Sequence, residues 1–115
     1  MVKFLQFLII LFLIFTIGGC NSIINTNQPP EITSMPITIA NIGEQYTYQV
    51  IATDPDNDEL SYSLLAFPSG MQINSSTGLV QWTPNQNQIK AYIVEIAVSD
   101  VNLSATQNYS LIVSE

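Results

Sequence analysis

Alternation of apolar and polar side chains with a period of two is the feature of this sequence that most restricts its fold. In QYTYQVIAT, residues 45–53, one face carries Tyr46, Tyr48, Val50 and Ala52 and the other carries Thr47, Gln49 and Thr53. Residues 90–100 repeat the pattern, with Tyr92, Val94, Ile96 and Val98 on one face and Glu95 on the other. Tyr109, Leu111 and Val113 continue it near the end of the chain. Successive side chains of a strand point to opposite faces, so each segment predicts a half-buried β-strand.

Shorter segments between turn residues complete this pattern. Strand signals occur at residues 32–40, 60–65, 71–73 and 79–82, and Pro36 marks the first of them as a broken edge strand. Turn segments such as FPSG and NSSTG separate the strands about every ten residues. No segment after residue 20 has a helical period. About seven strands in 115 residues predict an all-β fold, a single antiparallel β-sandwich.

The first twenty residues, MVKFLQFLIILFLIFTIGGC, differ in composition from the rest of the chain. Lys3 precedes an almost unbroken apolar run of 14 residues, Phe4 to Ile17, and two glycines follow it. A helix needs about 20 apolar residues to cross a bilayer. Residues 1–19 therefore predict a secretory signal peptide rather than a permanent transmembrane helix.

Cys20 is the only cysteine, and it directly follows Ile17-Gly18-Gly19. This arrangement resembles a bacterial lipobox, in which the cysteine is lipidated and becomes the first residue of the mature protein. A chance cysteine after an ordinary signal peptide is the alternative. The resemblance implies a lipid-anchored protein of the bacterial cell envelope, carrying acyl chains such as palmitate, with residues 20–28 as lipidated cysteine and polar tether. Asn21, in place of an aspartate, favours the outer membrane or the cell surface.

The charge balance excludes several classes of function. Nine acidic residues face only Lys3 and Lys90, without Arg or His, which gives a net charge of −7. Such a surface repels phosphate backbones, so we do not expect a nucleic-acid partner. Once Cys20 is lipidated, only carboxylates, Lys90 and hydroxyl groups remain for catalysis, and no catalytic constellation stands out among them. The sequence therefore predicts a protein that is not an enzyme.

Residues 53–60, TDPDNDEL, place carboxylates at every second position. In a sandwich, the turn after residue 53 and the turn after residue 99 lie at the same end of the domain. Four carboxylates then converge: Asp54, Asp56, Asp58 and Asp100. Calcium would relieve their mutual repulsion, because it accepts six to eight oxygen ligands in flexible geometry. The alternative is a solvated turn whose side chains hydrogen-bond the local backbone, and both interpretations stay open.

Five segments together carry a resemblance to a known family. They are PPEITSMP, GEQYTYQVIATDPDNDELSYSL, FPSGMQINSSTGLVQWTP, IVEIAVSDVN and ATQNYSLIV. In this order they resemble the bacterial putative-immunoglobulin module, a cadherin-like or dystroglycan-type cadherin-like sandwich, over nearly all of residues 29–113. The resemblance implies an Ig-like/cadherin-like β-sandwich over residues 29–115. Such domains usually occur as repeats in secreted or surface proteins and are associated with adhesion, carbohydrate-associated enzymes or multidomain scaffolds, whereas this sequence holds one copy.

The resemblance also bears on the acidic residues. Cadherin-like domains use a DxD in this loop and an aspartate at the end of the penultimate strand as calcium ligands. The matching residues here are Asp54, Asp56 and Asp100, with Asp58 and Asn102 as supplementary ligands. The acidic linker of a complete cadherin site is missing, since this linker offers only Asn27 and Gln28. An incomplete site implies weak binding, with a Kd of about 0.1 to 1 mM.

Two classes of function remain after these exclusions. The first is a membrane-anchored adhesion or binding module for a protein or glycan partner, stabilised by calcium. The second is a structural spacer or accessory subunit of an envelope complex. Trp82 is either an exposed platform for a sugar ring or a core residue, as a single Trp in a small sandwich usually is. A glycosidase built on the aspartates is a distant third idea, because the domain is small for a substrate cleft.

Overall fold

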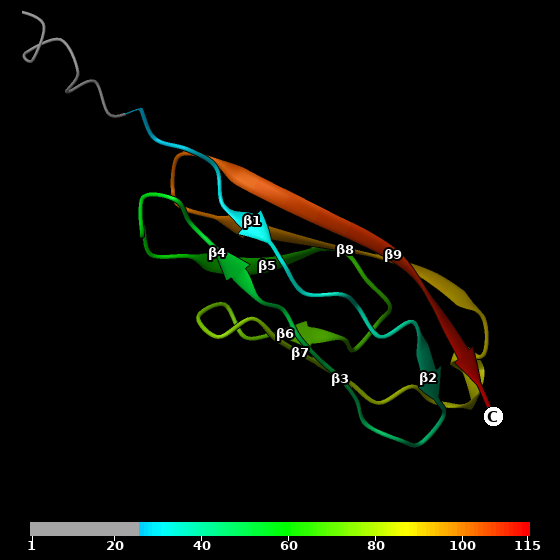
Figure 1. The fold of residues 1–115 in the computed structure, drawn as a ribbon. Helices are drawn as coiled ribbons and strands as arrows, with labels where there is room; N and C mark the ends of the chain where they lie inside the picture. The colour runs from blue at the N-terminus through cyan, green and yellow to red at the C-terminus, as the bar shows by residue number, and fades with distance from the viewer. Residues whose placement is uncertain (1–25) are drawn as a thin grey trace, which may run out of the picture.

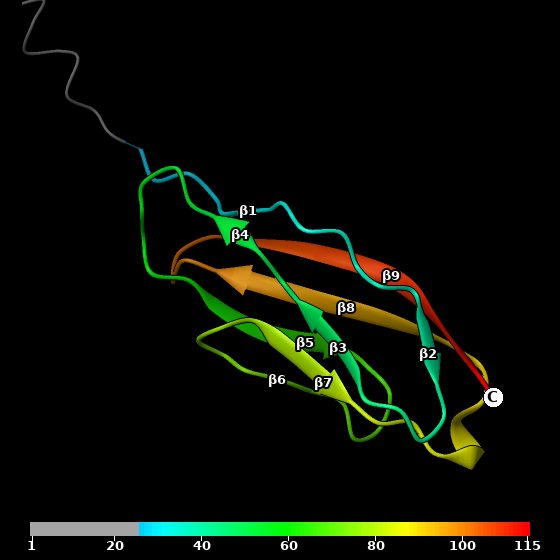
Figure 2. The ribbon, with the colours of Figure 1, turned by 60° about the horizontal axis from the view of Figure 1, so that its bottom comes forward.

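The computed structural model describes residues 26–115, which form two layers of β-strands packed face to face (Figures 1 and 2). Its strands are β1 (Glu31–Ile32), β2 (Ile39–Asn41), β3 (Tyr46–Gln49), β4 (Ala52–Thr53), β5 (Ser61–Ala66), β6 (Gln72–Ile73), β7 (Leu79–Trp82), β8 (Ala91–Ser99) and β9 (Ser104–Ser114). The four-stranded sheet has the order β2-β9-β8-β5, the three-stranded sheet has the order β3-β7-β6, and β1 and β4 form a two-stranded sheet. The all-β sandwich predicted from the sequence is confirmed. The predicted signal peptide and Cys20 lie outside the described residues.

The nine strands follow the seven predicted segments, two of which are broken. The segment at 32–40 forms β1 and β2 on either side of Pro36, and the segment at 45–53 forms β3 and β4. β1 pairs antiparallel with β4, whereas β2 pairs in parallel with β9 of the four-stranded sheet. The chain therefore crosses between the sheets near Pro36, which has no N–H to donate to a ladder. One short 3-10 helix, Gln86–Gln88, was not predicted.

The strands β8 and β9 form a long antiparallel hairpin in the middle of the larger sheet. Their register runs from Ala91 opposite Ile112 to Ser99 opposite Ser104. β5 pairs with the other side of β8 and carries a β-bulge between Leu64 and Ala66. The β8–β9 turn lies at the end of the domain where the described chain begins, and the β4–β5 loop lies at the same end (Figure 1). This is the arrangement that the sequence predicts for the two acidic turns.

The core lies between the two sheets and takes the alternate residues that the pattern predicts. Both sheets contribute to it: Tyr46, Tyr48, Val50, Val80, Trp82, Val94, Ile96, Val98, Tyr109, Leu111 and Val113 are all buried. Trp82 is 3% exposed and meets Tyr92 edge-on, with the ring centroids 5.6 Å apart. The indole Nε1 of Trp82 donates a hydrogen bond to the carbonyl oxygen of Ser69 at 3.1 Å. Trp82 is thus a core residue and presents no open ring face to a sugar.

No helix within residues 26–115 has the length and apolar character needed to span a membrane.

Candidate metal site at the N-terminal end of the domain

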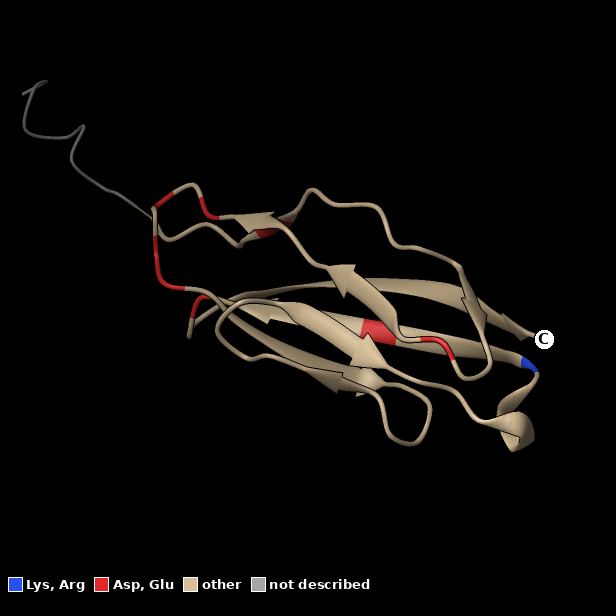
Figure 3. Ribbon diagram, turned by 90° about the horizontal axis from the view of Figure 1, so that it is seen from below, with Lys and Arg blue, Asp and Glu red and all other residues tan. Residues whose placement is uncertain are grey.

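Acidic residues gather at the N-terminal end of the domain, and Lys90 lies at the opposite end (Figure 3). The loop at residues 54–58 follows β4, and the turn at residues 100–103 joins β8 to β9. The segment that enters the domain contacts both of them. Asn27 Nδ2 donates a hydrogen bond to Asp100 Oδ2 at 3.0 Å, and Gln28 N donates one to Asp56 Oδ2 at 2.8 Å. Two turns and the entering chain therefore form one cluster.

Asp54 organises the first of these turns. Its Oδ1 accepts hydrogen bonds from the backbone N–H groups of Asp56 at 2.8 Å and Asp58 at 3.2 Å. Its carbonyl oxygen accepts the N–H of Asn57 at 3.1 Å, and Asn57 has a φ of 56°, which asparagine tolerates better than most residues. The second carboxylate oxygen, Oδ2, is buried without a hydrogen-bond partner among the described residues. A buried oxygen without a partner is costly, and a bound cation would satisfy this one.

The spacing of the three loop carboxylates fits a single hard cation. Asp54, Asp56 and Asp58 each offer one carboxylate oxygen, and these oxygens lie within 4.8 Å of one another. Calcium binds oxygen at 2.3–2.6 Å, so two ligands of the same ion lie at most about 5 Å apart. Magnesium requires shorter bonds and near-octahedral geometry, which a loop with partly committed oxygens meets less easily. The residues present therefore suit calcium better than magnesium.

Asp100 is fixed by hydrogen bonds in the second turn, where it is only 4% exposed. Its Oδ1 accepts the backbone N–H groups of Leu103 at 2.7 Å and Asn102 at 2.9 Å. The Leu103 N–H first, and then the Asn27 amide and the Asn102 N–H, hold the pKa of Asp100 below its ordinary value, although burial acts in the opposite direction. Asn102 contacts this carboxylate through its backbone N–H, and the role of its side chain as a supplementary ligand stays a prediction.

The electrostatics of Asp58 link the two turns. Its pKa is raised, first by lost hydration and then by the negative charges of Asp54, Asp100 and Asp56. Asp54 also adjoins Asp100 and contributes to the lowered pKa of that carboxyl group. All four carboxylates named from the sequence thus come together at this end of the domain. The sequence did not indicate that Asn27 and Gln28 hydrogen-bond them, and their place just before Pro29 was the only available signal.

Each interpretation of this cluster has support in the geometry. The hydrogen bonds from local backbone to Asp54 and Asp100 are those of a polar turn. The unpartnered Oδ2 of Asp54 and the repulsion that raises the pKa of Asp58 are the features that a bound cation would relieve. In the polar-turn interpretation, Asp54 Oδ2 has no hydrogen-bond partner among residues 26–115.

Comparisons with known proteins agree with the observed fold. The family described as Putative Ig domain matches residues 29–114. Integrin beta-like protein A of Dictyostelium discoideum is 32% identical over 79 residues, which are 64% of this chain and 4% of that protein. The likeness therefore concerns a small part of a much larger relative.

Two solved structures show the same fold. Human protocadherin-24 EC1-2 has a TM-score of 0.59 and 23% identity, and the match covers 78% of this chain and 45% of that one. A putative alpha-galactosidase from Bacteroides fragilis has a TM-score of 0.63 and 14% identity, with coverages of 74% and 17%. This chain spans less than half the length of each of these proteins. At such identities the likeness concerns the fold alone.

Proposed function

This chain belongs to the Putative Ig domain family, and from that premise we propose that it is a non-catalytic binding module, held on a bacterial membrane surface by lipid and stabilised by calcium. The observation that carries the proposal is the family match over residues 29–114, which accounts for almost all of the described domain. Domains of this family are typically non-catalytic. The names of the integrin-like relative and of protocadherin are those of adhesion-type proteins, which supports a binding role here.

The membrane attachment in this proposal rests on Cys20 and its neighbours. From Cys20 to Pro29 the tether spans nine residues, which reach at most about 30 Å when fully extended. The domain would then stand close to the membrane with its acidic end nearest to the anchor. In the full chain, Cys20→Ser should abolish the lipid mass shift and move the protein from the detergent phase to the aqueous phase. Unchanged partitioning of this variant would refute lipid anchoring at Cys20.

The calcium part of the proposal rests on the unpartnered oxygen of Asp54. Asp54, Asp56 and Asp58 would supply the first ligands, with Asp100 beside them. The ion would supply positive charge and link the two turns, while the chain's own residues orient the carboxylates. Asn27 and Gln28 already tie the entering segment to the same carboxylates, so the ion would also stiffen the junction between tether and domain.

Thermal melting of residues 21–115, first in chelator and then in calcium, tests this site. With a Kd of about 0.1 mM, 10 mM calcium should add about 2.7 kcal/mol to the free energy of unfolding. That gain should raise the Tm by roughly 10 °C, and magnesium should have a smaller effect. Asp54→Asn should remove the response. Glu59→Gln is the matched control, since Glu59 is an exposed acidic residue of the same loop outside the three-residue cluster. Without a calcium shift, the cluster is a polar turn.

The binding role itself is tested on native membranes. A binding module should capture a protein or glycan ligand selectively. A stoichiometric complex with other envelope proteins would instead favour the role of spacer or accessory subunit. Nuclease protection and nucleic-acid binding are not expected in either case, because Lys90 is the only basic residue among residues 26–115.

A further inference from the structure

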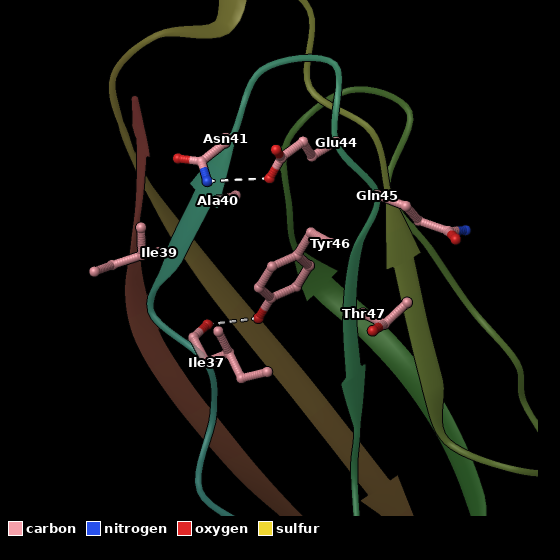
Figure 4. Close-up of a pocket in the computed structure, with 8 residues that line it drawn as sticks. All are labelled: Ile37, Ile39, Ala40, Asn41, Glu44, Gln45, Tyr46 and Thr47. Carbon is pink, nitrogen blue, oxygen red and sulfur yellow. Dashed lines mark hydrogen bonds between the residues drawn. The ribbon is translucent and has the colours of Figure 1, made fainter. Parts of the chain in front are cut away.

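The strands β2 and β3 are consecutive in the chain but belong to different sheets. β2 is the outer strand of the larger sheet, and β3 is the outer strand of the smaller one, on the same side of the sandwich. Between them lies a hollow of about 180 Å³, lined by residues from 37–41 and 44–47 (Figure 4). We call this hollow the β2–β3 cleft. Within residues 26–115, neither strand pairs on the side that faces it.

Both strands direct free backbone groups away from their partners. Val50 N donates to Gly78 O at 3.0 Å, so the even-numbered residues of this strand face β7. The N–H and C=O groups of Thr47 and Gln49 therefore point to the open side. Ile112 N donates to Thr38 O at 2.9 Å, so in β2 the backbone groups of Ile39 point away from β9. The cleft is thus bordered by unpaired donors and acceptors at strand spacing.

Tyr46 gives the cleft a fixed floor. The residue is 5% exposed, and its hydroxyl donates a hydrogen bond to Ile37 O at 2.7 Å while lying 3.0 Å from the hydroxyl of Tyr109. Figure 4 shows the ring between β2 and β3, with Ile37 and Ile39 on the β2 side. At the turn between the strands, Asn41 Nδ2 donates to Glu44 Oε2 at 3.2 Å, and this pair closes one end of the cleft.

The free edge of β3 at Thr47 and Gln49 carries no charge, proline or bulge. Natural proteins cover exposed edges with charged residues, proline or bulges. The residues of β3 that point outward are uncharged, whereas the edge strand β5 carries a bulge and donates its Tyr62 N–H to Ser75 O. Farther along the chain the crossing segment covers this edge, because Thr33 N donates to Ile51 O at 2.9 Å. The free edge therefore has the length of a short strand.

The room beside this edge suits one extended segment. Paired strands lie about 4.8 Å apart, so a segment paired with β3 would lie beside its free edge, on the solvent side of the Tyr46 ring. Glu44 places a carboxylate at the closed end, and residues 37–47 contain no Lys or Arg. The charge of the cleft and the net charge of −7 both favour a basic segment.

We propose that the β2–β3 cleft binds one extended, basic peptide segment of a partner protein, which adds to β3 as a further strand. Main-chain hydrogen bonds to Thr47 and Gln49 supply the pairing, and alternate side chains of the peptide contact Ile37 and the Tyr46 ring. The inference rests on the binding role proposed above and names its site and its class of partner.

Selection from a displayed library of random peptides of about 12 residues on the full-length protein in detergent tests this site. Enriched peptides should alternate β-branched with other residues and carry Lys or Arg. Thr47→Pro removes the outward N–H and should weaken their binding by about tenfold or more. Thr47→Val keeps that N–H and should bind as the unaltered chain does. Glu44→Gln should lower the affinity for basic peptides several-fold, and the affinity that remains should depend less on salt concentration.

A second measurement does not depend on folding of the proline variant. Methylation of alternate backbone nitrogens of the best peptide removes its own strand donors and should abolish binding to the unaltered protein. If no peptide is enriched, or if the methylated peptide binds as tightly as the unmethylated one, the proposal that the cleft accepts a strand is wrong. If the protein instead captures a glycan or folded partner equally well with Thr47→Pro, the binding role stands and this cleft is not its site.

Discussion

At the scale of single residues, Gly78 shows how close packing adds to the cost of a left-handed backbone. Gly78 has a φ of +76°, and a Cβ built there would lie 2.9 Å from the Tyr62 ring and 3.0 Å from Val50 O. Gly43 has nearly the same φ, +74°, but nothing within 4 Å of its Cβ position. Gly78→Ala should lower the free energy of unfolding by about 3 kcal/mol, and Gly43→Ala by about 1 kcal/mol. Equal losses in chemical denaturation would contradict the steric explanation.

The candidate site was predictable at this scale in part. Alternate aspartates in the 54–58 loop and one at the end of a strand indicate the four carboxylates, because sandwich topology brings the two turns to one end. The hydrogen bonds of Asn27 and Gln28 were not predictable, since a polar tether carries no period that fixes its path. Nor does a sequence tell which oxygen of Asp54 remains unpartnered, because that depends on how the loop closes around the other oxygen.

At the scale of elements, a polar network fastens the crossing between β1 and β2 to the core. The Tyr48 hydroxyl lies 2.7 Å from Ser34 Oγ and donates to Gln107 Oε1 at 2.9 Å. Gln107 Nε2 in turn donates to Ser34 O at 2.8 Å. Tyr48→Phe leaves these partly buried partners without the hydroxyl and should lower the free energy of unfolding by about 1 to 2 kcal/mol. Denaturant titration measures this loss.

Tyr92→Phe is the control for this network. Tyr92 packs edge-on against Trp82, and its hydroxyl makes no hydrogen bond that the structure shows within residues 26–115. Loss of this hydroxyl should lower the free energy of unfolding by at most about 0.5 kcal/mol. Hydrogen exchange adds a local readout, because Ile51 N donates to Ser34 Oγ and should exchange faster only in Tyr48→Phe. Similar behaviour of the two variants would argue against a role of the network.

The alternation in the sequence predicted the strands well but not where they change partners. Residues 45–53 have one uninterrupted period, yet the strand breaks after Gln49. The ladder with β7 ends there because Gly78 donates its N–H to Asn74 O within its own turn, and Ile51 bonds the crossing segment. β9 begins at Ser104, well before the predicted apolar pattern at Tyr109. Its first five residues contain no large apolar side chain, so the backbone register with β8 extends the strand there. Pairing depends on neighbours distant in sequence, which a local period does not encode.

At the scale of the whole molecule, the charge is distributed unevenly, and this sets how stability depends on pH. The four aspartates Asp54, Asp56, Asp58 and Asp100 lie at the N-terminal end, where most of the acidic residues gather, and Lys90 lies at the other (Figure 3). The pKa of Asp58 is higher in the folded state than in the unfolded state. As the pH falls through the folded-state pKa, the folded protein therefore binds a proton before the unfolded chain does, and the contribution of Asp58 to the free energy of unfolding increases. The pKa of Asp100 is lowered, so its contribution is present above its unfolded pKa and is lost as the pH falls through the folded value.

Asp58→Asn should therefore change stability in opposite directions with and without calcium. In chelator at neutral pH the variant should melt above the unaltered protein, because it removes a charge that Asp54, Asp100 and Asp56 repel. Near pH 4 this advantage should shrink, since Asp58 is then partly protonated in the folded state. In 10 mM calcium the variant should melt below the unaltered protein, because a neutral amide replaces a charged ligand.

The reversal separates a metal site from simple relief of repulsion. A polar turn without an ion would leave Asp58→Asn the more stable protein in chelator and in calcium alike. Glu59→Gln removes a neighbouring charge that lies outside the cluster. The sign of its Tm difference from the unaltered protein should therefore be the same in chelator and in calcium. General screening of the −7 chain by added salt would move all three proteins together. A crossing confined to Asp58→Asn therefore places the ion at this loop, because only a ligand gains from keeping its charge when calcium is present.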